Sequence, residues 1–187
     1  LEDLGADFYT SNAHKWLCAP KASGFLYVRP AAQALVEPLV ISWGGKSPAP
    51  EGRAFLDEQQ WPGTRDISAF LAVPAALRFC AAHDWPRVRR QCHALAAHAR
   101  ARLGALTALP PICPDSPDWY AQMAAVRLPP CDGPQLKARL WEQFRVEVPV
   151  TERPEGNYLR VSIQAYNSGD DVDRLLDGLR QLLPARA

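Results

Sequence analysis

Asn12-Ala13-His14-Lys15-Trp16 is the stretch that decides the fold, because it joins two apolar runs with the composition of β-strands. Phe8-Tyr9 precedes it, and Gly24-Phe25-Leu26-Tyr27-Val28 follows it. This pattern predicts a β-hairpin of residues 7–11 and 24–29, with Lys15 in the connection. Packing around a lysine removes water from its amine and favours the neutral, nucleophilic form that a Schiff-base lysine requires. Taken alone, a lysine in such a connection is more often an exposed loop residue.

The composition of the 187-residue chain is that of a soluble globular protein, with 48% hydrophobic and 22% charged residues. This length corresponds to one domain or to parts of two. The formal net charge of +1 gives no overall field that would favour nucleic acid or a membrane surface, and neither partner is expected. The arginine-rich face between Arg87 and Arg102 is interpreted as a solvated helix face.

The cysteines indicate a cytoplasmic protein with reduced thiols. There are five of them, an odd number, and no two are arranged as C-x-x-C. A disulfide framework or a zinc ribbon is therefore not expected. Cys92-His93 lacks a second ligand pair, so no metal site is predicted.

The beginning of the chain suggests a fragment. Leu1 leads directly into Leu4-Gly5-Ala6-Asp7-Phe8-Tyr9, the approach to a buried strand, with no partner element before it. We therefore expect the chain to be the C-terminal part of a longer protein.

Beyond the hairpin, turn-rich loops at residues 46–53 and 61–66 lead into helical segments. A helix over residues 68–83 should be bent or interrupted at Pro74, and Asp84 should cap a long amphipathic helix. After the prolines at 110–117, the pattern predicts strands at 122–128, 146–150 and 158–163, and helices at 134–144 and 169–183.

Four separated blocks resemble the class V aminotransferase-like enzymes of fold type I, which use pyridoxal phosphate. The blocks are residues 11–16 running into 24–28, Gly63-Thr64-Arg65-Asp66, residues 146–150, and Leu159-Arg160-Val161-Ser162 with Tyr166-Asn167. Within the class, residues 14–21 and 160–167 are most similar to the isopenicillin N epimerase-like branch. The resemblance implies an α/β fold. Residues 1–84 would end the large cofactor-binding domain, 85–108 would form a connecting helix, and 109–187 a small α+β domain.

The resemblance also implies roles for individual residues. Lys15 would form the Schiff base with pyridoxal 5′-phosphate and carry the α-proton of the substrate. Asn12 and His14 would lie near the cofactor, and Thr64 would bind its phosphate from the neighbouring subunit of a homodimer. Arg160 would bind the α-carboxylate of an amino acid substrate. The strand around Arg160 is apolar, and a guanidinium buried there needs an anion; a structural salt bridge is the less favoured source of that anion.

Several functions remain open at this point. The leading hypothesis is epimerisation at the α-carbon of an amino acid or peptide-like substrate; a β-eliminating lyase or aminotransferase shares its first steps. Cysteine desulfurase activity is disfavoured, because no cysteine lies between Val146 and Arg160. A non-catalytic remnant is a further alternative. In this fold the N-terminal half supplies the aspartate for the pyridine nitrogen, so the chain alone is expected to be weakly active or inactive.

Overall fold

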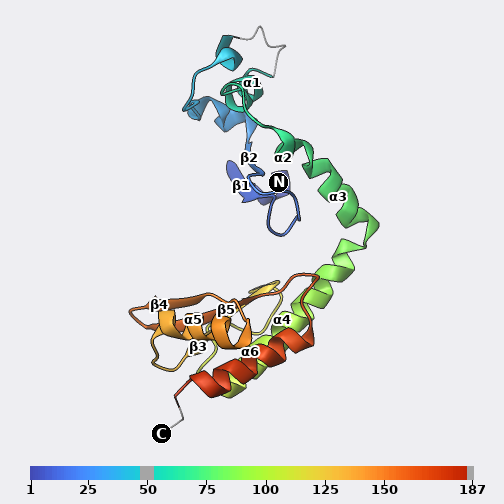
Figure 1. The fold of residues 1–187 in the computed structure, drawn as a ribbon. Helices are drawn as coiled ribbons and strands as arrows, with labels where there is room; N and C mark the ends of the chain where they lie inside the picture. Colours follow the sequence, from blue (N-terminus) through green and yellow to red (C-terminus); the bar gives the residue numbers. More distant parts are fainter. Residues whose placement is uncertain (47–52, 185–187) are drawn as a thin grey trace. The chain divides into compact units, whose positions relative to one another are not determined.

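A computed structural model describes residues 1–46 and 53–184, which divide into two compact units, Leu1–Ala82 and His83–Ala187 (Figure 1). Most of the predicted loop at residues 46–53 lies outside the described residues. None of the described helices is both long and apolar enough to cross a bilayer.

The first unit begins with a short 3-10 helix, η1 (Glu2–Leu4), and the predicted hairpin, which is confirmed. Strands β1 (Phe8–Asn12) and β2 (Gly24–Val28) pair antiparallel, with Phe8 opposite Val28 and Asn12 opposite Gly24. A Cβ atom on Gly24 would lie 3.1 Å from the backbone oxygen of Ser11, so glycine permits this close approach of the strands.

Short helices make up the rest of this unit: η2 (Pro30–Leu35), η3 (Trp43–Lys46), α1 (Ala54–Gln60), α2 (Ser68–Leu71) and α3 (Val73–Ala82). The predicted interruption of the helix over residues 68–83 is confirmed. Helix α2 ends two residues before α3 begins, and Pro74 occupies the first turn of α3. Proline is tolerated there because the first backbone N–H groups of a helix have no partner within it.

The second unit contains a three-stranded antiparallel sheet in the order β3-β5-β4, formed by Met123–Leu128, Gly156–Ser162 and Val150–Arg153. The prediction of a strand at 146–150 is wrong, because β4 begins only at Val150. The last ladder contact is the bond from the Arg160 N–H to the oxygen of Pro149, at 3.1 Å. Proline has no N–H to return that bond, so the pairing ends there.

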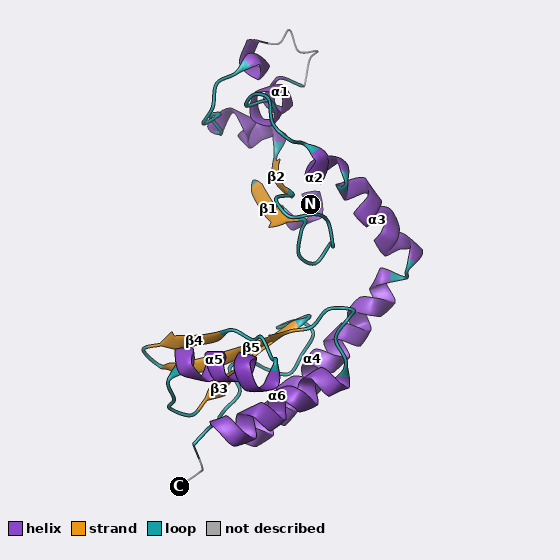
Figure 2. Ribbon diagram, viewed as in Figure 1, coloured by secondary structure: helices purple, strands orange, loops and turns teal. Residues whose placement is uncertain are grey.

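Three helices cover one face of this sheet, as Figure 2 shows: α4 (Trp85–Thr107), α5 (Gly133–Phe144) and α6 (Gly169–Leu182). The apolar stripes of these helices meet the inward residues of β3 and β5. The leucines with the least exposed side chains are Leu103, Leu140, Leu159, Leu176 and Leu179. The opposite face of the sheet carries Met123, Ala125 and Arg160, and none of these is buried.

Side chains cap the beginnings of these helices. Asp84 accepts a hydrogen bond from the backbone N–H of Arg87 (3.3 Å), and the Ser168 N–H donates to Asp171 (3.0 Å). At the other ends, Ala108 follows α4 and Arg145 follows α5 with φ angles of 53° and 55°. Both residues therefore hold the left-handed conformation that glycine adopts most easily.

Candidate functional site

Lys15 lies in an ordered turn that follows β1. The backbone N–H of Ala13 donates to the oxygen of Ser23 (3.0 Å), and the N–H of Ala19 donates to the oxygen of Ala13 (3.1 Å). Ala13, Ala19 and Ser23 are buried, whereas the side chain of Lys15 is exposed. The turn is therefore fixed at its base and presents the amine outward. The expectation that neighbouring side chains strip water from this amine is wrong within this chain.

His14 and Asn12 flank the same turn. The Nδ1 atom of His14 lies 3.1 Å from the backbone oxygen of Ser23, a contact that requires a proton on Nδ1. The Nε2 atom is then left for another partner, to which it donates when the ring is protonated. Asn12 ends β1 with an exposed side chain, so its amide can also contact a ligand.

Thr64 lies in an exposed bend directly after Gly63, whose φ angle of 132° favours glycine. The residues after it are anchored. Arg65 donates to the oxygen of Gln60 (2.9 Å) and its guanidinium lies 5.1 Å from the ring centre of Phe70.

Asp66 fixes the backbone just before helix α2, because its carboxylate accepts a 2.8 Å hydrogen bond from the backbone N–H of Ser68. Hydrogen bonds from the side chain and backbone of Ser68 hold the pKa of Asp66 below its ordinary value. The threonine hydroxyl is therefore carried on a loop with a defined geometry.

Arg160 belongs to the second unit, where it lies on the central strand β5. Leu159 and Val161 point into the core, so the alternation of the strand places Arg160 on the exposed face, opposite Ala125 of β3. The expected burial of this guanidinium is therefore wrong. Among residues 1–46 and 53–184 no ion pair includes Arg160, so its charge is available to an external anion.

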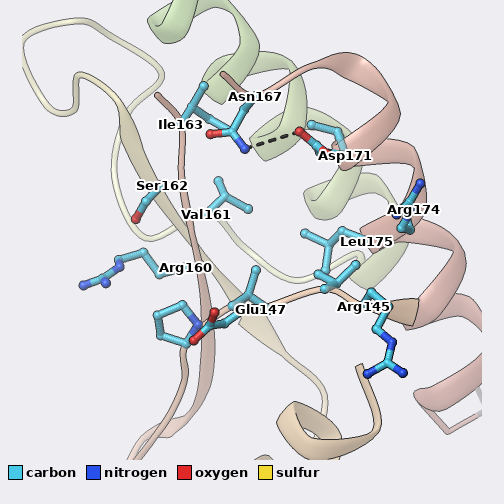
Figure 3. Close-up of a pocket in the computed structure, with 14 residues that line it drawn as sticks. Arg145, Glu147, Arg160, Val161, Ser162, Ile163, Asn167, Asp171, Arg174 and Leu175 are labelled. Atoms are coloured by element: carbon cyan, nitrogen blue, oxygen red, sulfur yellow. Dashed lines mark hydrogen bonds between the residues drawn. The ribbon is translucent and has the colours of Figure 1, made fainter. Parts of the chain in front are cut away.

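A cavity of about 250 Å³ lies beside β5, where the segment before β4 separates from it (Figure 3). Its polar lining comes from Arg145, Glu147, Arg160, Ser162, Asn167, Asp171 and Arg174. The Asp171 carboxylate accepts hydrogen bonds from the Asn167 amide (3.3 Å) and the Ser168 N–H. In Figure 3 the guanidinium of Arg160 points away from Arg145 and Arg174, so the three arginines do not converge on one point.

Sequence reasoning missed the residue that holds the lysine turn together. Ser23 is 1% exposed, its hydroxyl donates to the oxygen of Pro20 (2.6 Å), and its backbone oxygen accepts from Ala13 and contacts His14. The only signal was a small polar residue directly before Gly24, which is common in turns. The structure has His14 and Lys15 in one turn, Asn12 at the end of the strand that leads into it, and Thr64 in the same unit.

The chain matches the model of the aminotransferase class-V family over residues 1–175. It is 39% identical to the isopenicillin N epimerase of Amycolatopsis lactamdurans and 35% identical to that of Streptomyces clavuligerus. Each match covers 97% of this chain and 48% of the relative. A probable chloroplastic L-cysteine desulfhydrase of Arabidopsis thaliana is 34% identical over 98% of this chain and 41% of its own length.

Solved structures share the fold. The apo cysteine desulfurase of Thermococcus onnurineus superposes with a TM-score of 0.75 at 22% identity, covering 97% of this chain and 48% of that one. The cystine C-S lyase C-DES gives 0.72 at 20% identity, over 98% of this chain and 48% of that one. The predicted α/β fold of fold type I is therefore confirmed, and the family supports the predicted cofactor. This chain, which spans about half the length of these relatives, belongs to the aminotransferase class-V family.

Proposed function

We propose that this protein forms the lysine-bearing and carboxylate-binding part of a pyridoxal 5′-phosphate enzyme that epimerises an amino acid or peptide-like amino acid at its α-carbon. The observation that carries the proposal is the ordered turn that presents Lys15 directly after His14 and three residues after Asn12, in a chain 39% identical to an isopenicillin N epimerase. The cytoplasmic location inferred from the cysteines stays a prediction.

The residues of the first unit fit the chemistry of this cofactor. Lys15 offers an exposed amine that can hold its aldehyde covalently, and His14 and Thr64 offer donors for its phosphate. Asn12 adds an amide at the end of β1. The bound cofactor withdraws electrons from the α-carbon of the substrate, which makes the α-proton acidic.

Lys15 has a second task in this proposal. Its Nζ atom takes the α-proton, and protonation from the other side of the α-carbon inverts the stereocentre. The amine must be neutral to accept a proton. Its exposure within this chain means that further surface is needed to exclude water from it.

Arg160 binds the substrate carboxylate. A planar guanidinium forms two parallel hydrogen bonds with a carboxylate, which fixes orientation as well as position. What supports this role is the absence of any ion pair to Arg160 among the described residues, together with its place on the open face of the sheet.

A β-eliminating C–S lyase is the second candidate. The observation that favours it is the 34% identity to a probable L-cysteine desulfhydrase. Lys15 and Arg160 would act in the same way up to removal of the α-proton, and the reactions differ only in the bond that breaks next. A non-catalytic remnant remains the alternative for the chain by itself.

The competent enzyme, in this proposal, also contains a region equivalent to the half of the relatives that this chain does not match. Support comes from the hairpin, in which all five residues of β1 and the first three of β2 are exposed although several are large and apolar. Thr64 would serve the cofactor of a partner subunit in a homodimer.

The proposal is tested by adding pyridoxal phosphate to the purified chain, reducing with borohydride and mapping the modified lysine by mass spectrometry. Lys15→Ala is the informative variant. Lys21→Ala is its matched control, because Lys21 is an exposed lysine in the same hairpin connection. We expect the modification to occur at Lys15 and to be suppressed by an added amino acid. It should be lost in Lys15→Ala and should persist in Lys21→Ala.

Equal modification of Lys15 and Lys21 would overturn the assignment of Lys15. The reaction type is then resolved by incubating the enzyme, together with the region equivalent to the unmatched half, with an L-amino acid in deuterated water. Exchange of the α-proton with inversion supports epimerisation. Release of an oxo acid and the β-substituent supports the lyase.

A further inference from the structure

A second cavity, of about 200 Å³, shares Arg160 with the site described above. It is lined by Arg100, Ile112, Cys113, Trp119, Tyr120, Met123, Ala124, Ala125 and Arg160. Apart from the two arginines, this lining is apolar or aromatic. Cavities for whole drug-sized ligands measure about 300–1,000 Å³, so this one suits a single group of a larger molecule.

Met123, Ala125 and Arg160 bring the open face of the sheet into this cavity, and Arg100 of α4 and the buried Ala124 line it as well. Met123 is opposite Ser162 and Ala125 is opposite Arg160, so side chains of β3 and β5 stand next to one another on the face that the helices leave uncovered. Trp119, Ile112 and Met123 are 64%, 43% and 42% exposed, although each is a large apolar side chain. Their grouping beside an available guanidinium is typical of a ligand-binding surface.

The loop that forms one wall of the cavity is held in place by Arg100. This side chain is 11% exposed, pairs with Asp115 at 3.2 Å and lies 5.4 Å from the ring centre of Tyr120. It also donates to the backbone oxygen of Cys113, while the Tyr120 hydroxyl donates to Asp115. Partial burial, and then the contact with Asp115, raise the pKa of Tyr120, so its hydroxyl stays protonated. The wall is therefore preformed, and the charge of Arg100 is already neutralised.

We propose that this cavity receives an apolar group of the substrate whose carboxylate binds Arg160, with Trp119 and Met123 determining specificity. The proposal rests on the proposed function of Arg160. It names the substrate class: an amino acid or peptide-like acid with an extended apolar or aromatic group near its carboxylate, in preference to a small acid such as cysteine. A ligand that buries a large apolar group in this cavity binds more tightly than one that has only a methyl group to bury, because more apolar surface leaves water.

Simple carboxylates test this specificity without the cofactor. The ¹⁵N-labelled full chain is titrated with propanoate and with 3-phenylpropanoate, and NMR shifts are followed at the Arg160 backbone amide and the Trp119 indole N–H. We expect 3-phenylpropanoate to shift both signals and to bind about ten-fold more tightly than propanoate. Trp119→Ala and Met123→Ala should each reduce that advantage, with propanoate binding unchanged.

Two controls keep the outcomes distinct. Trp141→Ala removes an equally large tryptophan that is 50% exposed on α5, and it should leave both affinities unchanged. Arg160→Gln should abolish the shifts caused by either acid. Propanoate binding at Arg160 with no added affinity from the phenyl group would refute the apolar site. So would a tighter binding of 3-phenylpropanoate that survives both Trp119→Ala and Met123→Ala. In either case the proposed function stands. If neither acid perturbs Arg160, the carboxylate role itself is refuted.

Discussion

The two units of this protein differ in whether their large apolar side chains are buried. In the second unit, three helices and one face of the sheet enclose a continuous core that includes Leu103, Leu140 and Leu159. In the first unit, most buried apolar side chains are small, such as Ala13, Ala19 and Ala32, with Val28 the largest, while most large apolar side chains are exposed.

This difference implies that the second unit is the more stable one and that the lysine turn belongs to the less stable one. A two-stranded hairpin is at best marginally stable by itself, and the turn that carries Lys15 is part of such a hairpin. Ligand-contacting segments are commonly drawn from the less stable parts of a protein. Arg160, in contrast, extends from a strand that contributes to the continuous core of the second unit, so its backbone is the more firmly held.

The largest expected effect comes from truncating the same residue type in each unit. Leu140→Ala empties a fully buried position and should lower the free energy of unfolding by about 2–5 kcal/mol. Leu39→Ala changes a side chain that is 102% exposed, and it should change the free energy of unfolding by no more than about 0.5 kcal/mol. Urea unfolding followed by circular dichroism measures both. Equal losses would mean that the contrast between the units does not exist.

Thiol labelling compares the units without altering the sequence. Cys92 is buried in α4, and burial raises the pKa of its thiol, so less reactive thiolate is present at pH 8. Cys18, in the lysine turn, is exposed. We expect iodoacetamide to modify Cys92 at least about a hundred-fold more slowly than Cys18, as peptide mapping can measure. Similar rates would indicate that the second unit opens readily.

A glycine pair gives the finest comparison within the second unit. A Cβ atom on Gly178 of α6 would lie 2.8 Å from Leu140 and 3.1 Å from the ring of Phe144, so Gly178→Ala overpacks the contact with α5. The expected net loss is about 1–2 kcal/mol, because overpacking outweighs the gain in helix propensity.

Gly104→Ala in α4 is the matched control for this variant. Nothing lies within 4 Å of its added Cβ, so the change should stabilise the protein by up to about 1 kcal/mol. A stabilising Gly178→Ala would show that α5 and α6 are less closely packed than described. Thermal unfolding distinguishes the two signs.

The elements with the strongest periodicity could be predicted from the sequence. The apolar spacing and the capping aspartate of α4 identified that helix, and two short apolar runs identified the hairpin. The strand at 146–150 failed because its β-branched residues fit a strand while its pairing depends on Pro149, which lacks the donor that continues a ladder. Local composition indicates which backbone conformation a segment favours, but not whether it can form hydrogen bonds with a neighbouring strand.

The candidate site was predictable only where its residues are contiguous. His14 and Lys15 share the connection of the hairpin, as expected, whereas Asn12 ends β1. Apolar neighbours in the sequence did not mean burial of Lys15 or Arg160. For Arg160 the alternation with Leu159 already favoured the exposed face. The cluster that joins Arg100 to Asp115 and Tyr120 could not be foreseen, because helix α4 meets that loop only in the folded unit.

The left-handed residues that follow α4 and α5 have a consequence for how this chain tolerates change. Ala108 and Arg145 occupy a conformation that costs an L-residue about 1–2 kcal/mol and costs glycine little. Substituting glycine at either position therefore removes this conformational cost and raises the free energy of unfolding. This gives the chain mutational robustness, because a change to glycine at a helix end can offset a destabilising substitution elsewhere in the second unit.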